Sequence, residues 1–464
     1  MTRYPVSYKV CDAFPGPTCA AQHATSSLVR HVRVLRLAFG LALFLRPALS
    51  TAAPTAFAKG PWLSQLGSRE VTVRAETNPP APLSLQITHD GKSVVLTDPA
   101  SLLHSVHATG LEPRTRYEYT AAASGAKVTG SFTTAPSDDD EASFRFLVYG
   151  DNRSDAITHA GVVRALEQEP GDFLLNTGDL VGDGSRENQW QLFFDIESTL
   201  LRDRCLFAAI GNHELEEAGG PTFLRYFGGE RTQVPGKLYG SMRWGRARFF
   251  FLNGEASFQG DDRGWLEEEL TRADTEQNLR WRFIVVHNGL FASGVHGDNK
   301  AMHDANVPQM LVRHHVDLLI EGHDHLYERG FEEGLRYVVS GGGGAPLYPV
   351  RNRHAGTRKV ESTHHLIAFD VGKDAVTLVA KRLDGTALET ASFTKENGWD
   401  DDPAVVPKPV FPTPGATAPA GASREKCSCD VVGAPHSAPP ILLAPLVLLL
   451  RWLRRRGGRR YARS

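Results

Sequence analysis

The chain has 464 residues, of which 41% are hydrophobic and 22% charged, and its formal net charge is −2. This length suggests two or three domains with a substantial core, and the composition excludes a collagen-like or wholly disordered chain. Residues 1–58 carry a net charge of +5 and residues 451–464 carry +7, so the body between them carries −14. Because such a body would repel a phosphate backbone, we expect no nucleic-acid partner.

Residues 1–58 are predicted to form a leader and signal peptide. Three arginines between residues 30 and 36 precede an apolar run over 37–45, and a small-residue stretch ends at Ala56-Phe57-Ala58. A basic flank, a short apolar segment and an A-x-A site are together typical of a secretory signal. We therefore expect a secreted or cell-surface protein.

Residues 59–136 show short alternating patterns with no helical period between them. Strands are predicted over 70–75, 83–87, 93–96 and 117–119, with turn residues such as Asn78-Pro79-Pro80 separating them. This pattern predicts a small all-β sandwich. The phrase from Leu111 to Tyr117 resembles the tyrosine corner of fibronectin type III domains, and we assign no chemistry to it.

Residues 142–396, which follow an acidic hinge, have the pattern of an α/β domain. Helical periods at 160–167 and 265–270 separate apolar runs, and residues 364–394 resemble hairpin strands that complete a sheet. The buried strands are predicted at 146–149, 173–175, 206–210, 283–286 and 316–320. Strands buried on both faces that alternate with helices predict a β-sheet core flanked by helices.

The C-terminal end divides into a Pro/Ala/Gly-rich linker over 397–440, which includes Cys427-Ser428-Cys429, and an apolar, Arg-rich tail over 441–464. The order of these features resembles the C-terminal sorting tails of myxobacterial-type secreted proteins. That resemblance implies anchoring through the tail and a transient contact with a membrane or with sorting machinery. The alternative is a frayed tail with weak membrane affinity. Only Cys205 lies in the folded body, so no disulfide framework is expected there.

A polar cluster follows each of five apolar runs. The clusters are Gly150-Asp151-Asn152-Arg153, Gly178-Asp179-Leu180, Gly211-Asn212-His213-Glu214, His287-Asn288-Gly289 and Gly322-His323-Asp324-His325. Ligands of α/β proteins gather at the carboxyl ends of strands, so these clusters should converge on one place. Carboxylates, an amide and imidazoles suit two first-row metal ions, and a carboxylate can bridge them.

This series resembles the calcineurin-like metallophosphoesterases, and the preceding β unit indicates their purple-acid-phosphatase-like branch. Further phrases of that branch recur at 293–297, 325–329 and 341–348. The resemblance implies two divalent or trivalent metal ions (Fe, Mn or Zn). It implies that Asp151 and His325 bind the first metal, that Asp179 bridges both, and that Asn212, His287 and His323 hold the second.

The resemblance also implies catalytic roles for three residues. His213 would protonate the leaving alkoxide, with Glu214 tuning or orienting it, and His296 is a second candidate for substrate contact or proton transfer. His296 could equally be a solvated loop residue. Arg153 could bind a phosphate oxygen, or it could form an ion pair with an acidic neighbour.

Two positions depart from the family pattern. Arg153 stands where the broader superfamily often has a metal-binding histidine, and Gly182 stands where the purple enzymes have a tyrosine. The first metal therefore lacks a usual protein ligand. We expect no iron(III)–tyrosinate band and a first metal that is more exchangeable or more water-rich.

The predicted function is hydrolysis of small-molecule phosphomonoesters by attack of a metal-bound hydroxide, without a covalent enzyme intermediate. Three alternatives remain open. The same scaffold could serve a phosphodiesterase or nucleotidase. The chain could be a non-catalytic surface binding protein with a vestigial metal site. A Ser-His-Asp hydrolase is disfavoured because no strand end carries a G-x-S-x-G elbow.

Overall fold

The structure is a computed structural model that describes residues 56–228 and 234–401. Three predicted segments lie largely or wholly outside the described residues. They are the leader up to residue 55, the linker from residue 402 onward and the whole sorting tail. Strand β1 (Phe57–Ser64) begins inside the predicted A-x-A site, so cleavage after Ala58 would remove the first two residues of this strand. Within the described ranges, no helix combines the length and apolarity needed to cross a membrane.

The N-terminal part contains five strands joined by antiparallel pairing into one sheet. They are β1, β2 (Glu70–His89), β3 (Lys92–Thr109), β4 (Arg116–Ala123) and β5 (Ala126–Thr133). β2 pairs with β3 along most of its length, whereas β1 pairs with the first half of β2 and β4 with the second half. The Tyr117 hydroxyl accepts a hydrogen bond from the Glu112 amide at 2.9 Å, which ties the corner before β4 to that strand.

One predicted boundary in this part is wrong. We expected a turn at Asn78-Pro79-Pro80, but these residues lie inside β2. The pairing of β2 with β3 shifts register between Glu76 and Leu83, so the strand passes the prolines as an irregularity instead of ending there. The fibronectin-like character of the unit stays a prediction.

The α/β part contains two sheets. One has the order β18-β17-β16-β6-β7-β8 and the other β15-β13-β14-β12-β11-β10-β9. The strands of the first are β6 (Phe144–Tyr149), β7 (Phe173–Asn176), β8 (Cys205–Ala208), β16 (His365–Val371), β17 (Ala375–Arg382) and β18 (Ala387–Thr394). The strands of the second are β9 (Gly240–Trp244), β10 (Ala247–Leu252), β11 (Trp281–Val286), β12 (Leu318–Glu321), β13 (Tyr327–Glu332), β14 (Leu335–Ser340) and β15 (Thr357–Glu361).

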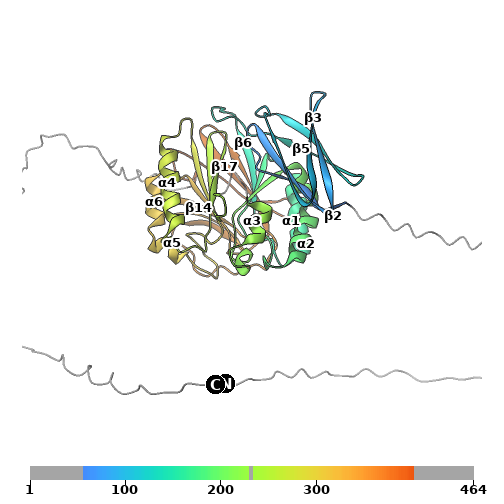
Figure 1. The fold of residues 1–464 in the computed structure, drawn as a ribbon. Coiled ribbons are helices and arrows are strands. Elements are labelled where there is room, and N and C mark those ends of the chain that lie inside the picture. The colour runs from blue at the N-terminus through green and yellow to red at the C-terminus, as the bar shows by residue number, and fades with distance from the viewer. Residues whose placement is uncertain (1–55, 229–233, 402–464) are drawn as a thin grey trace, which may run out of the picture.

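Helices cover the outer faces of both sheets, with α4, α5 and α6 on one side and α1 and α2 on the other (Figure 1). They are α1 (Ala156–Gln168), α2 (Glu187–Asp203), α3 (Pro221–Phe227), α4 (Asp261–Thr275), α5 (Lys300–Asp304) and α6 (Val307–Arg313). The predicted helical periods lie within α1 and α4. The expectation of a sheet core flanked by helices is confirmed, with two sheets in place of one.

Aromatic side chains fill the space between the sheets. The ring of Phe146 on β6 lies 5.3 Å from that of Phe249 on β10 and 5.8 Å from that of Phe283 on β11. Successive residues of a strand point to opposite faces, so Leu147 belongs to the cluster under α1 and α2 and Ile284 to the cluster under α4, α5 and α6. Each central strand is therefore buried on both faces, as its continuous apolar sequence predicts.

The strand directions decide where the polar clusters meet. β6, β7 and β8 run parallel to one another, and so do β10, β11, β12 and β14. The five clusters follow β6, β7, β8, β11 and β12, so each lies just beyond a carboxyl end. β8 ends at Ala208 and β12 starts at Leu318, two residues inside the predicted limits in each case.

The N-terminal sheet docks on the helical side of the α/β part. β1 contacts α2 and β8, and the buried Trp62 ring lies 4.7 Å from that of Phe194 on α2. The Tyr119 hydroxyl donates to the Arg202 carbonyl at 2.9 Å.

Candidate metal centre

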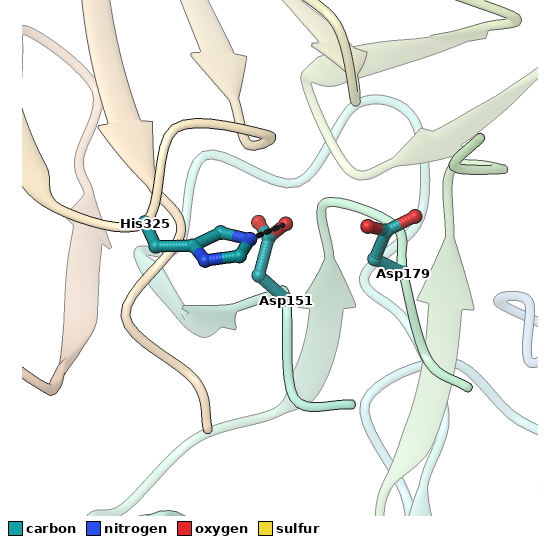
Figure 2. A group of neighbouring side chains, drawn as sticks. All are labelled: Asp151, Asp179 and His325. Carbon is teal, nitrogen blue, oxygen red and sulfur yellow. Dashed lines mark ion pairs between the residues drawn. The ribbon is translucent and has the colours of Figure 1, made fainter. Parts of the chain in front are cut away.

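All six predicted metal ligands lie together at the carboxyl ends of the two sheets. One group consists of Asp151, Asp179 and His325, whose nearest donor atoms lie within 4.8 Å of one another. His325 Nε2 is 3.4 Å from Asp151 Oδ1. Figure 2 shows the His325 ring directed at Asp151, with the Asp179 carboxylate beyond it. All three side chains are buried.

The second group surrounds His287. Its Nε2 atom lies 3.2 Å from Asn212 Oδ1, 3.2 Å from His323 Nδ1 and 3.3 Å from Asp179 Oδ1. Asp179 therefore belongs to both groups, with Oδ1 facing the His287 side. This is the position that a bridging carboxylate needs.

The donor set fits a cation. Asp151 Oδ1 is buried and makes no hydrogen bond to any described residue, although buried polar atoms are almost always hydrogen-bonded. His287 Nδ1 donates to the Thr177 carbonyl at 3.0 Å, and His325 Nδ1 donates to the Pro346 carbonyl at 2.6 Å. Since each Nδ1 atom faces a carbonyl and carries a proton, Nε2 is the ring nitrogen that can bind a metal, and in His287 it does so after losing its own proton.

The pKa shifts reflect the density of charge at the site. Burial opposes a charge on His287, but the Asp179 and Asp151 carboxylates outweigh it and raise its pKa to about 10. Burial also opposes a charge on Asp179, yet His287, His213 and Arg153 hold its pKa well below the usual range. Burial, together with the neighbouring His287 and His296, lowers the pKa of His323 to about 3. The carboxylate is thus ionised and surrounded by positive groups, as an ion-binding position requires.

The backbone at these strand ends is strained. Asp151, Asp179 and His323 have φ values of +56°, +57° and +69°, in the left-handed region that non-glycine residues rarely adopt. Such conformations cost on the order of 1–3 kcal/mol each and concentrate at functional sites. At Gly211, a Cβ atom would collide with the Asp179 carboxylate, which explains the glycine before Asn212.

Glu214 has a different contact from the one we expected. Its carboxylate does not reach the His213 ring; it accepts hydrogen bonds from the amides of Asp179 (3.0 Å), Val181 (3.1 Å) and Gly211 (2.9 Å). Burial and the Asp179 charge raise its pKa to about 7. Glu214 therefore holds together the loops that carry Asp179 and Asn212, because these buried amides need an acceptor.

His213 is oriented by a backbone carbonyl instead. Its Nδ1 atom donates to the Gly182 carbonyl at 2.7 Å, and its Nε2 atom lies 3.9 Å from Asp179 Oδ2. The side chain is 24% exposed, so one edge of the ring faces solvent beside the donor cluster. This position suits contact with a bound molecule.

His296 lies on the same open side, with its side chain 34% exposed. Its ring stacks on that of His323 at 3.8 Å, and its Nδ1 atom lies 3.1 Å from Asp324 Oδ1. Asp324 also accepts hydrogen bonds from the amides of Gly294, Val295 and His296. His296 is therefore a positioned side chain, which disfavours the alternative of a solvated loop residue.

Arg153 points into the donor cluster. Its Nε atom donates to Asp179 Oδ2 at 2.9 Å, and one terminal nitrogen lies 3.3 Å from His325 Nε2. Of the two predicted alternatives, the described contacts match an ion pair with an acidic neighbour, and that neighbour is the expected bridging ligand.

Sequence reasoning missed two residues of this site. Asp324 lies between the predicted ligands His323 and His325, and its position in the sequence does not indicate that it contacts the loop of His296. Tyr348 stacks on the His325 ring at 3.9 Å with an interplanar angle of 13°. Tyr348 lies in the noted phrase over 341–348, but nothing in its local pattern indicates which side chain it covers.

The loop anchor at Glu214 has a testable consequence. Glu214→Ala should lower the free energy of unfolding by about 2–4 kcal/mol, because three buried amides lose their acceptor. It should also weaken binding of Zn²⁺, since both anchored loops carry candidate ligands. Urea unfolding and calorimetric titration measure the two effects.

The exposed neighbour Glu216 provides the matched control, and Glu216→Ala should behave like the wild type in both measurements. Wild-type stability and wild-type zinc affinity in Glu214→Ala would contradict the anchoring role.

Part of the chain is similar to known phosphoesterases. Residues 144–327 match the calcineurin-like phosphoesterase family. An uncharacterized protein of Mycobacterium tuberculosis is 27% identical over 310 residues, which cover 57% of each chain. Purple acid phosphatase 21 of Arabidopsis thaliana is 28% identical over 246 residues, covering 49% of this chain and 53% of its own. The chain thus spans a little over half the length of these curated relatives.

Among solved structures, a purple acid phosphatase from yellow lupin (Lupinus luteus) seeds superposes with a TM-score of 0.63 at 18% identity, covering 72% of this chain and 74% of that chain. At this identity the likeness concerns the fold. The resemblance predicted from the strand-end series is confirmed as a match of residues 144–327 to the calcineurin-like phosphoesterase family, while the fibronectin-like and sorting-tail resemblances stay predictions. Residues 144–327 of this chain therefore match the calcineurin-like phosphoesterase family, and the similar proteins include purple acid phosphatases.

Proposed function

We propose that the protein is a secreted, metal-dependent hydrolase of small-molecule phosphomonoesters whose centre holds two metal ions. The observation that carries the proposal is the position of Asp179, which lies between His287 and Asn212 on one side and Asp151 and His325 on the other. The names of the purple acid phosphatase relatives support the phosphatase assignment. The fold supports a phosphoesterase domain over 142–396, preceded by the β unit at 59–136.

Metal ions held there would supply positive charge at the reacting phosphate and lower the pKa of a coordinated water toward ~7. Asp151 and His325 would hold one ion, Asn212, His287 and His323 the other, and Asp179 would bridge them. Neutral imidazole nitrogens and ionised carboxylates are the donor forms that this requires. Carboxylate, amide and imidazole ligands are all compatible with Fe, Mn and Zn, so each of these metals fits the proposed centre.

His213 and His296 would act on the substrate from the open side of the centre. The Gly182 carbonyl fixes the proton on His213 Nδ1, so Nε2 is the atom that can deliver a proton to the departing alkoxide oxygen. In His296, Nδ1 faces Asp324, so Nε2 is free to contact a phosphate oxygen. Water then supplies the hydroxyl group that phosphorus gains, and the products are an alcohol and inorganic phosphate.

Secretion is the second part of the proposal and rests on the signal-like pattern over residues 30–58. The buried Cys205 is consistent with either compartment, since it has no partner thiol among the described residues. Attachment through the tail over 441–464 would add a sorting contact.

Metal removal and substrate comparison test the function directly. Chelation of the purified protein should abolish hydrolysis of p-nitrophenyl phosphate, and re-addition of a single metal should restore it. A phosphodiester and a nucleoside monophosphate should be hydrolysed more slowly under the same conditions. Faster diester or nucleotide hydrolysis would assign the alternative substrate class, and a metal-free, inactive, stable protein would favour a binding protein.

The proton donor has its own test. His213→Ala should keep its bound metal but lower kcat by roughly 10²–10⁴, the usual contribution of general acid catalysis. His89→Ala, at a half-exposed histidine of the N-terminal sheet, is the control and should keep full activity. Loss of metal from His213→Ala would make His213 a ligand and contradict the assigned role.

A further inference from the structure

The side chain of Arg153 lies among the candidate metal ligands and not on the protein surface. Its guanidinium is hydrogen-bonded to Asp179 Oδ2 at 2.9 Å, reaches within 3.3 Å of His325 Nε2, and is only 14% exposed. Tyr348, which stacks on His325, also interacts with this guanidinium. Arg153 is therefore enclosed by residues of one half of the centre.

The atoms that Arg153 contacts are those that the first metal would need. His325 Nε2 presents its lone pair to the centre because Nδ1 donates to the Pro346 carbonyl. Asp179 Oδ2 is the oxygen that faces away from His287. A guanidinium has donors only and stays charged at any pH at which proteins fold, so it cannot become a ligand. A metal ion and Arg153 would compete for the same two atoms.

The cationic group of the other half is His287, which, unlike a guanidinium, can release its Nε2 proton and become a metal ligand. Asp179 Oδ1 faces His287, and the neighbours of His287 Nε2 are the Asn212 oxygen and the His323 ring, both of which can bind a metal. The two halves therefore differ in the number of candidate ligands, and only the Arg153 half holds a cation that cannot become a ligand.

We propose that Arg153 is a built-in cation that competes with the first metal ion for Asp179, so that the two metal positions fill unequally. The position formed by Asp179, Asn212, His287 and His323 fills first and tightly. The position formed by Asp151, Asp179 and His325 fills weakly, because the Arg153 hydrogen bond to Asp179 must break. This inference rests on the proposed metal centre and adds the order in which it is loaded.

Zn²⁺ binding to the full, metal-stripped chain tests the inference by calorimetric titration, with the bound zinc counted by elemental analysis. The wild type should bind one ion tightly and a second ion at least tenfold more weakly. A tenfold loss of affinity is about what breaking one charge-assisted hydrogen bond costs. Arg153→Gln should strengthen binding of the second ion by roughly tenfold or more, so that the affinities of the two ions become more similar. Arg153→Lys, which keeps the positive charge, should retain much of the difference in affinity between the two ions.

Arg186→Gln is the matched control, because Arg186 forms a surface ion pair with Asp183 at 2.7 Å in the loop after Asp179. It should titrate like the wild type. Two equal sites in the wild type, or weaker binding of the second ion in Arg153→Gln, would overturn the inference while leaving the proposed function in place. A wild type that binds no zinc would contradict the proposed function itself.

Discussion

The structure depends on the burial of two carboxylates, Asp151 and Asp179, beside each other at one end of two facing sheets. A buried charge is costly unless positive or hydrogen-bonding groups offset it. Asp179 is offset by the Arg153 guanidinium, the His287 ring and the His213 amide. Asp151 Oδ1 has the His325 and His287 rings near it but no hydrogen bond. A centre of this kind is built to attract cations.

The surrounding residues serve to hold these carboxylates in place. Parallel strands bring Asp151 and Asp179 to the same edge, and left-handed backbone at each residue turns its side chain into the centre. Glu214 ties the loops after β7 and β8 together, and Asp324 does the same for the loop that carries His296. Such anchoring of ligand loops through buried carboxylates keeps donor positions fixed before any ion binds.

The strand ends and the α/β architecture could be predicted from sequence because each depends on a local pattern. Continuous apolar runs identify β6, β7 and β11, and the polar residues that follow them are recognisable by type. The roles of Glu214 and Arg153 could not be predicted in the same way. Glu214 follows His213 in sequence but contacts the loops of Asp179 and Gly211, and Arg153 reaches across to His325. These contacts depend on how loops that are distant in sequence pack together, and a local sequence pattern does not predict such packing.

The most direct measurement is anomalous diffraction from crystals soaked in Zn²⁺, with data collected on both sides of the zinc absorption edge. We expect an anomalous peak about 2.0–2.2 Å from both Asp179 Oδ1 and His287 Nε2. A second peak next to Asp151 and His325 should have lower occupancy. Well-ordered crystals whose anomalous density lies elsewhere, with none among these residues, would contradict the account.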